Sequence, residues 1–260
     1  MNIQKMIKSI SALAVVAAIS APTSILAETI GKDPFKAYGD KIAFDVFRKG
    51  SPVGTHEVTF RRDGEDIIAK TRFEVSIKIF VVPVYYYLYT STERWREGKL
   101  ISLTAKTNDN GDVSDLQVTR DNDALVLTGT GGDFTAPGTF YPTTHWNSGA
   151  IGSTQVINTI TGKINNVELQ DRGIETVTSK HGALQANHFA YQGDLTTEVW
   201  YDSAGKWVKM RFPGKDGVMI EYQCRACGVH STKTGARLND ETKVAQLSNT
   251  MSKENAQHDR

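Results

Sequence analysis

The sequence predicts a mainly β protein: a single, strongly curved antiparallel meander, forming an open barrel or a β-spiral, with a short helical insertion. Residues 67–81 alternate between apolar and polar side chains, the period-2 pattern of a half-buried strand. Short alternating segments follow at intervals of about 8 to 12 residues, separated by turn residues. No tandem repeat of fixed period is visible, which disfavours a propeller or a solenoid.

The N-terminal residues have the composition of a signal peptide. Lys5 and Lys8 precede an uncharged apolar run at 10–21, and Ile25-Leu26-Ala27 fits a cleavage site. The apolar run is too short to span a membrane. We therefore expect residues 1–27 to be removed, leaving an exported, periplasmic protein without an integral membrane span.

Charge and cysteine content exclude several classes of protein. The 30 Lys and Arg nearly balance the 29 Asp and Glu and are interspersed with them, so we expect no nucleic-acid partner and no electrostatic attraction to anionic lipid. Two cysteines cannot staple a mini-scaffold, so the fold must depend on its apolar core. Charges on strands such as 207–211 disfavour an outer-membrane barrel.

The chain divides into a leader without regular structure (28–40), a curved β domain (41–235) and a polar, flexible tail (236–260). Turn residues such as Asp63-Gly64 separate the predicted strands. We expect about thirteen strands, at 41–46, 53–62, 67–81, 84–96, 100–107, 113–120, 124–130, 166–169, 174–178, 184–191, 195–201, 207–212 and 218–222.

The strand at 67–81 and the tyrosine-rich segment after it define the expected interior. At about 3.3 Å per residue the strand would reach roughly 50 Å, so it must curl or bulge. Pro83 has no N–H for a ladder, so we expect the strand to end or turn a corner there. Both faces are apolar just after Pro83, which indicates burial on two sides or a cavity wall.

The strand rhythm breaks at 133–162, where prolines and glycines bracket an aromatic group. Ser153 is a candidate cap for a short helix that carries Val156 and Ile157 and ends at Gly162. We expect this insertion to cover one open end of the sheet as a lid.

Cys224 and Cys227 form a C-x-x-C pair at the end of the last strand, for which the favoured interpretation is a local disulfide. A redox pair is less well supported, because no helix N-terminus or βαβ unit is evident. A metal site with His230 is the third alternative, although a fourth ligand is lacking.

Aromatic residues and one histidine are the candidate ligand-binding groups, although aromatic-rich strands also fit a packed core. They are Tyr85, Tyr87, Tyr89, Trp95, His145 and Trp146. Glutamates on strands are candidate acid–base partners for His145, namely Glu57, Glu74, Glu93 and Glu198. No nucleophile elbow, phosphate-binding loop or calcium loop is present, and we expect no cofactor.

Several local patterns resemble a family of exported proteobacterial proteins known only as a domain of unknown function. They are Gly54-Thr55-His56-Glu57, Glu93-x-Trp95-x-x-Gly98-x-Leu100, Thr107-Asn108-Asp109-Asn110-Gly111, Pro142-Thr143-Thr144-His145-Trp146, Trp200-Tyr201-Asp202 and Asp216-Gly217. The resemblance covers roughly residues 37–222 and is similar in outline to periplasmic β-spiral and half-barrel proteins, including lipoprotein-carrier-like proteins. It implies a curved sheet around a hydrophobic cavity, and it supplies no catalytic residues.

These observations favour a periplasmic binding or envelope-maintenance protein that holds a lipid, an acyl chain or a peptide in a curved sheet. One alternative is an exported hydrolase that uses His145 and a glutamate as acid and base. Another is a structural module that binds an envelope protein. Binding is favoured over catalysis, and the sequence leaves ligand identity and oligomeric state open.

Overall fold

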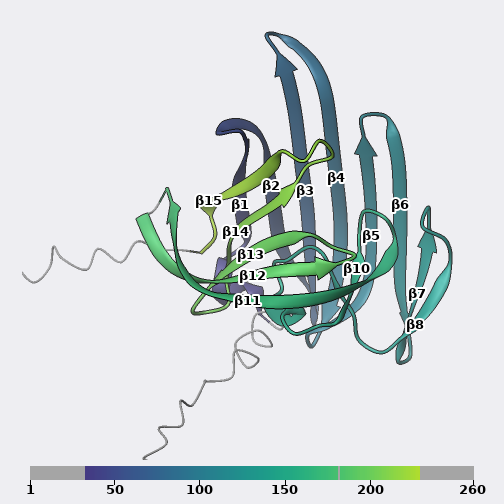
Figure 1. The fold of residues 1–260 in the computed structure, drawn as a ribbon. Coiled ribbons are helices and arrows are strands. Elements are labelled where there is room, and N and C mark those ends of the chain that lie inside the picture. Colours follow the sequence, from purple (N-terminus) through teal and green to yellow (C-terminus); the bar gives the residue numbers. More distant parts are fainter. Residues whose placement is uncertain (1–32, 181, 229–260) are drawn as a thin grey trace, which may run out of the picture.

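The computed structural model describes residues 33–180 and 182–228, which form one large, open, curled sheet (Figure 1). Its first strands are β1 (Lys41–Arg48), β2 (Ser51–Asp63), β3 (Asp66–Ile79), β4 (Val82–Arg96), β5 (Lys99–Asp109), β6 (Asp112–Asp121), β7 (Ala124–Gly129) and β8 (Phe134–Pro137). The remaining strands are β9 (Tyr141–Pro142), β10 (Gln155–Asn158), β11 (Lys163–Ser179), β12 (Gly182–Gly193), β13 (Thr197–Asp202), β14 (Trp207–Pro213) and β15 (Met219–Ala226).

The strand order shows how the sheet is closed into a curl. It runs β8-β7-β6-β5-β4-β3-β2-β1-β15-β14-β13-β12-β11-β10-β9, so pairing of β1 with β15 joins the two halves of the meander. All pairs are antiparallel except β9 with β10. In Figure 1 the long strands β2 to β6 stand as one wall and β11 to β14 cross in front of it. The prediction of a mainly β, strongly curved antiparallel sheet is confirmed.

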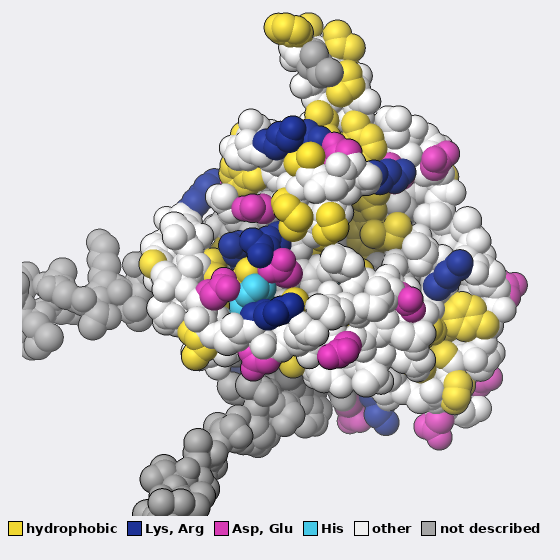
Figure 2. Space-filling model, in the orientation of Figure 1, with side chains coloured by type: hydrophobic (Ala, Val, Ile, Leu, Met, Phe, Trp, Pro, Cys, Tyr) yellow, Lys and Arg dark blue, Asp and Glu magenta, His cyan; other side chains and the backbone are white. Residues whose placement is uncertain are grey.

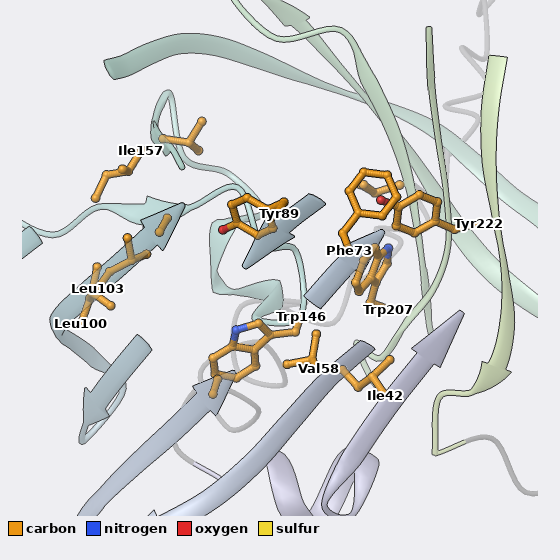
Figure 3. Close-up of a cluster of buried hydrophobic side chains, with 14 of the residues drawn as sticks. Ile42, Val58, Phe73, Tyr89, Leu100, Leu103, Trp146, Ile157, Trp207 and Tyr222 are labelled. Carbon is orange, nitrogen blue, oxygen red and sulfur yellow. The ribbon is translucent and has the colours of Figure 1, made fainter. Parts of the chain in front are cut away.

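Most of the buried hydrophobic side chains form one cluster between these walls. Figure 3 shows Phe73, Trp207 and Tyr222 gathered on one side and Leu100 and Leu103 on the other. Strand alternation explains this arrangement, because every second residue of each strand faces the inside of the curl. The core is therefore continuous from β1 and β15 at the seam to β8.

The β3–β4 hairpin differs from the predicted corner at Pro83. The turn lies at Phe80 and Val81, and Pro83 lies within β4, opposite Lys78. A register shift between Ile77 and Lys78 accommodates the proline, which is the expected place for a residue that cannot donate to a ladder. Val82 and Val84, just after the turn, are exposed rather than buried on two sides, and Val84 and Tyr85 line a groove, which was the second of the two expected alternatives.

The helix expected at 153–162 was also wrong, because that segment contains β10. Val156 and Ile157 are both buried, and β10 pairs with β9 and β11. The insertion contains only a short 3-10 helix, η1 (Ser148–Ala150). Hydrogen-bonding partners on both sides favour a strand over a local helix for this β-branched pair.

The leader contains structure that the sequence did not suggest. Helix α2 (Pro34–Tyr38) begins with Pro34, a residue suited to the first helical position. The buried Tyr38 hydroxyl accepts a hydrogen bond from the backbone N–H of Trp207 at 2.8 Å and donates one to the backbone carbonyl of Trp146 at 3.0 Å. Helix α2 thereby ties the insertion to β14.

Two strands expected at 166–169 and 174–178 are one strand, β11. The segment expected to separate them, at Asp171 to Gly173, is a bulge, where the register with β12 shifts. A bulge uses the same glycine and aspartate as a turn does, so the local sequence cannot separate the two.

Part of the predicted organisation lies outside the described residues. The signal peptide at 1–27, the start of the leader, residues 229–235 of the β domain and the tail at 236–260 belong to this part. Within the described ranges, no helix is long and apolar enough to cross a membrane.

Candidate ligand-binding groove

A groove of about 780 Å³ lies between the β3–β4 hairpin and the β14–β15 hairpin. This volume is in the range of small-molecule sites, about 300–1,000 Å³. Its apolar and aromatic lining consists of Phe73, Val75, Ile77, Val84, Tyr85, Tyr87, Ile160, Phe212, Pro213 and Ile220. In Figure 2 a hollow floored by hydrophobic side chains lies below the protruding hairpin.

Strand register places the lining residues side by side. On the β3–β4 pair, Val75 lies opposite Tyr87 and Ile77 lies opposite Tyr85. On the β14–β15 pair, Phe212 lies opposite Ile220. Directly opposed residues of antiparallel strands project to the same face, so each hairpin presents one apolar wall to the groove.

Charged side chains complete the lining, and two ion pairs organise them. Asp109 accepts a hydrogen bond from the Tyr85 hydroxyl at 2.8 Å and pairs with Lys215 Nζ at 2.7 Å. The Asp109 carboxylate raises the pKa of Lys215, while burial together with Asp109 raises the pKa of Tyr85. Arg48 pairs with Asp216.

Lys78 also lines the groove, and its side chain is exposed. Among residues 33–180 and 182–228 no carboxylate forms an ion pair with it. Within the described structure, the groove therefore offers one cation, Lys78, that is not neutralised by a neighbouring acid.

The structure brings together two of the six predicted ligand-binding residues, Tyr85 and Tyr87. The other four lie in the closed core: Tyr89, Trp95, His145 and Trp146 are at most 5% exposed. Along β4 the buried face continues below the groove, so the same alternation that places Tyr85 and Tyr87 in the lining places Tyr89 and Trp95 in the core.

Sequence reasoning missed the opposite wall of the groove. Phe73, Val75 and Ile77 belong to the alternating segment at 67–81, but Phe212 and Ile220 lie more than a hundred residues later. Alternation indicates which face each strand buries, but it does not predict which strands lie close together when they are far apart in the sequence. The seam between β1 and β15 brings the two walls together.

Glu93 is buried in the core and does not line the groove. Its Oε2 accepts hydrogen bonds from Trp95 Nε1 at 2.8 Å and Trp146 Nε1 at 3.1 Å. Its Oε1 has no hydrogen-bond partner among the described residues. Burial raises the pKa of this carboxyl to about 7, against the opposing effect of the two indole donors and of Thr144.

The remaining glutamates named as acid–base candidates form ion pairs on the strands. Glu57 pairs with Arg225 and Lys41, and Glu74 pairs with Arg72. Glu198 Oε2 lies 2.7 Å from His188 Nε2 and 2.7 Å from Arg211. The structure therefore pairs Glu198 with a different histidine from the one that the sequence singled out.

His145 and His56 lie in the core, and both contact Trp207, with ring-centroid distances of 6.0 and 5.2 Å. Burial lowers the pKa of His145 to about 4. Burial, reinforced by the nearby His145, lowers that of His56 to about 3. Within the described part of the chain, no glutamate hydrogen-bonds to His145. Both imidazoles are therefore neutral core residues at neutral pH.

Cys224 and Cys227 form the predicted disulfide, with their Cα atoms 5.9 Å apart. Cys224 lies opposite Phe44 on β1, so the bridge closes the end of the β1–β15 seam. Bonded sulfurs are not available as thiolate ligands, and His230 lies outside the described residues. The described chain holds no group of three or more His, Cys, Asp or Glu side chains arranged to bind a metal ion.

Comparison with known proteins agrees with this architecture. A family model described as a domain of unknown function, DUF6134, matches residues 44–225. The chain belongs to the DUF6134 family. This DUF6134 chain is also similar to a crystal structure titled as a β-barrel-like protein of domain of unknown function DUF1849 from Brucella abortus, with a TM-score of 0.51 and 10% identity.

The alignment covers 72% of the DUF6134 chain and 95% of the Brucella chain. At this identity the likeness shows the fold alone. A search of curated proteins found no match. The family comparison thus confirms the expected resemblance to a domain of unknown function, while function has to be argued from the groove.

Proposed function

We propose that this DUF6134 protein binds an apolar ligand, the acyl chain of a lipid, in the groove between the β3–β4 and β14–β15 hairpins. The observation that carries the proposal is the lining itself: two apolar walls with a few charged groups at the exposed positions. Sites of this composition suit ligands with a long apolar body and few polar contacts. An acyl chain fits that description better than a polar peptide does.

The charged groups suit the polar end of such a ligand. Lys78 and Lys215 are exposed residues of the groove lining, and Lys78 has no acidic partner among the described residues. A carboxylate or phosphate at the end of an acyl chain would accept a charge-assisted hydrogen bond from the Lys78 ammonium, whereas Lys215 is already paired with Asp109. The apolar chain would then lie along Ile77 and Phe212.

The proposed location is the periplasm, and the composition of residues 1–27 supports export. A lipid-holding protein in that compartment would serve transport or maintenance of the cell envelope. The geometry does not support the predicted acid–base pair at His145, because His145 is buried and forms no hydrogen bond with a glutamate in the described chain.

The experiment is a titration with a fluorescent fatty acid, together with mass spectrometry of protein purified without detergent. We expect a bound acyl species and saturable probe binding. Ile77→Asp places a carboxylate in the half-buried apolar wall and should weaken probe binding at least tenfold, because a charge loses its hydration there.

Ile174→Asp is the matched control, since Ile174 is 69% exposed on β11 and lies outside the groove lining. It should leave probe affinity unchanged. A protein that carries no lipid and does not bind the probe, or an I77D variant that binds as tightly as wild type, would refute the proposal.

A further inference from the structure

The tip of the β3–β4 hairpin carries apolar side chains that the fold leaves in solvent. Phe80 is 97% exposed, Val81 87%, Val82 60% and Val84 47%. They are four of the seven exposed large hydrophobic residues in the described chain. Figure 1 shows this hairpin extending beyond its neighbours, and Figure 2 shows hydrophobic side chains at its end.

Turn chemistry does not explain these residues. Phe80 has φ of 56°, in the left-handed region that favours glycine or asparagine. Each neighbouring hairpin turn contains a glycine or asparagine at positive φ, in two cases after a charged residue: Lys49-Gly50, Gly64, Glu97-Gly98, Asn110-Gly111 and Asn122. The Phe80-Val81 turn contains neither. A phenylalanine at this position is unfavourable for both turn formation and solvation, which indicates a role outside the isolated fold.

We propose that this tip inserts into the surface of a lipid bilayer. The exposed side chains surround a two-residue turn and are open on all sides, a shape that lipid tails can enclose. A specific protein interface uses about 20–30 residues from each partner, whereas the tip offers four exposed apolar side chains. A bilayer is therefore a better fit than a protein surface.

When the tip is inserted, the residues just below it would lie at the level of the lipid headgroups. Lys78 is exposed, and Tyr85 and Tyr86 are partly exposed. Lysine can bury its methylene stem and keep its ammonium in water, and tyrosine is enriched at membrane interfaces. The two residues from Lys78 to Phe80 span roughly 7 Å at the rise of a strand, which matches interfacial insertion of about 5–10 Å.

The tip also adjoins the groove. Val84 belongs to both, and Ile77, Lys78 and Tyr85 line the groove from the same hairpin. A bilayer-inserted tip would therefore place the groove next to the headgroup region. Membrane binding by the tip does not require the proposed acyl ligand, so the two proposals are tested separately.

The test is flotation of the mature chain, residues 28–260, which omits the apolar run of the predicted signal peptide, with vesicles of pure phosphatidylcholine, or of phosphatidylethanolamine and phosphatidylglycerol at 3:1. Because insertion is apolar and the chain has nearly balanced charges, we expect flotation with both compositions and in high salt. The double variant F80G/V81S supplies a favoured two-residue hairpin turn while removing the apolar tip. It should fold and lose at least nine-tenths of the flotation.

Two further variants complete the design. Ile174→Ser removes an exposed isoleucine from β11 and should float as wild type does. Phe80→Trp should show a blue-shifted emission when vesicles are added, against a constant signal from the four native tryptophans, which are at most 1% exposed.

The acyl probe separates this inference from the proposed function. F80G/V81S should bind the probe with wild-type affinity in the absence of vesicles, whereas I77D should lose the probe and still float. Wild-type protein that stays unbound with both vesicle compositions would overturn the inference. So would flotation of a folded F80G/V81S variant at the wild-type level.

Discussion

Trp146 donates an indole hydrogen bond to Glu93, 53 residues earlier in the chain, at 3.1 Å. Both side chains are completely buried. The bond joins the irregular insertion to strand β4, and Trp95 donates to the same carboxylate oxygen. The insertion is thereby anchored in the core, at a group whose ionisation is costly.

Glu93→Gln should alter the dependence of stability on pH. The pKa of Glu93 in the folded protein is about 7, above the ordinary 4.5, so its contribution to stability is complete below pH 4.5 and is lost as pH rises to about 7. The loss is about 3 kcal/mol. We expect E93Q to lack this decline, and its free energy of unfolding at pH 7.5 to equal or exceed that of wild type. Urea unfolding at a series of pH values measures this, and an unchanged profile would contradict it.

His56→Leu should reduce acid sensitivity. The pKa of His56 in the folded protein is about 3, below the ordinary 6.5. The contribution of His56 to stability is therefore fully present above pH 6.5 and is lost as pH falls toward 3. Between pH 6.5 and 4.5 one such histidine costs about 2–3 kcal/mol.

H56L should not lose this free energy of unfolding in acid. Its stability at pH 7.5 should be close to that of wild type, because Leu suits the ring-lined site formed by Phe44 and Trp207. His145→Leu should act in the same direction, from a folded pKa of about 4. An H56L variant as acid-labile as wild type would disprove the assignment. Glu93 has the opposite effect, because its protonation stabilises the folded protein as pH falls. Measuring H56L and H145L in the E93Q background removes this effect.

Gly54→Ala should destabilise the β2–β3 pair. A Cβ added at Gly54 would lie 1.9 Å from the Glu74 carbonyl oxygen, so the two backbones would have to separate. We expect a loss of at least about 2 kcal/mol, the size typical of severe local strain. Thr59→Ala, at an exposed position on the same strand, is the control and should change stability by less than about 0.5 kcal/mol. Chemical denaturation distinguishes the two outcomes.

Removal of the disulfide should have a modest effect. The bridge joins residues three apart. Closing so small a loop lowers the entropy of the unfolded chain and stabilises the folded protein by about 2 kcal/mol. Cys224→Ala/Cys227→Ala should lower the unfolding midpoint by a corresponding amount, and reductant should lower the wild-type midpoint but not that of the double variant. A reductant response in the double variant would show that the effect arises elsewhere.

Local sequence signals predicted much of the sheet. Alternation at 67–81 marked β3, and Asp63-Gly64 marked the β2–β3 turn, because strand periodicity and turn chemistry are properties of adjacent residues. The same signals were wrong at 153–162. Val156 and Ile157 gained partners in β9 and β11, and a local pattern cannot represent such tertiary partners.

The candidate site was only half visible for the same reason. Tyr85 and Tyr87 were predicted as ligand-binding residues and line the groove, whereas Tyr89, Trp95, His145 and Trp146 are packed in the core. An aromatic residue satisfies a pocket wall and a packed interior equally well, so its type does not distinguish them.

The sequence by itself determined the β class, the order of most strands and the pairing of Cys224 with Cys227, because each depends on residues close together in the chain. Only the tertiary structure decided that β1 pairs with β15, that Phe212 faces the β3–β4 hairpin across a groove, and that Phe80 remains in solvent. These features depend on how far the sheet curls. Curl is the sum of twists and bulges over fifteen strands, and no single segment encodes it.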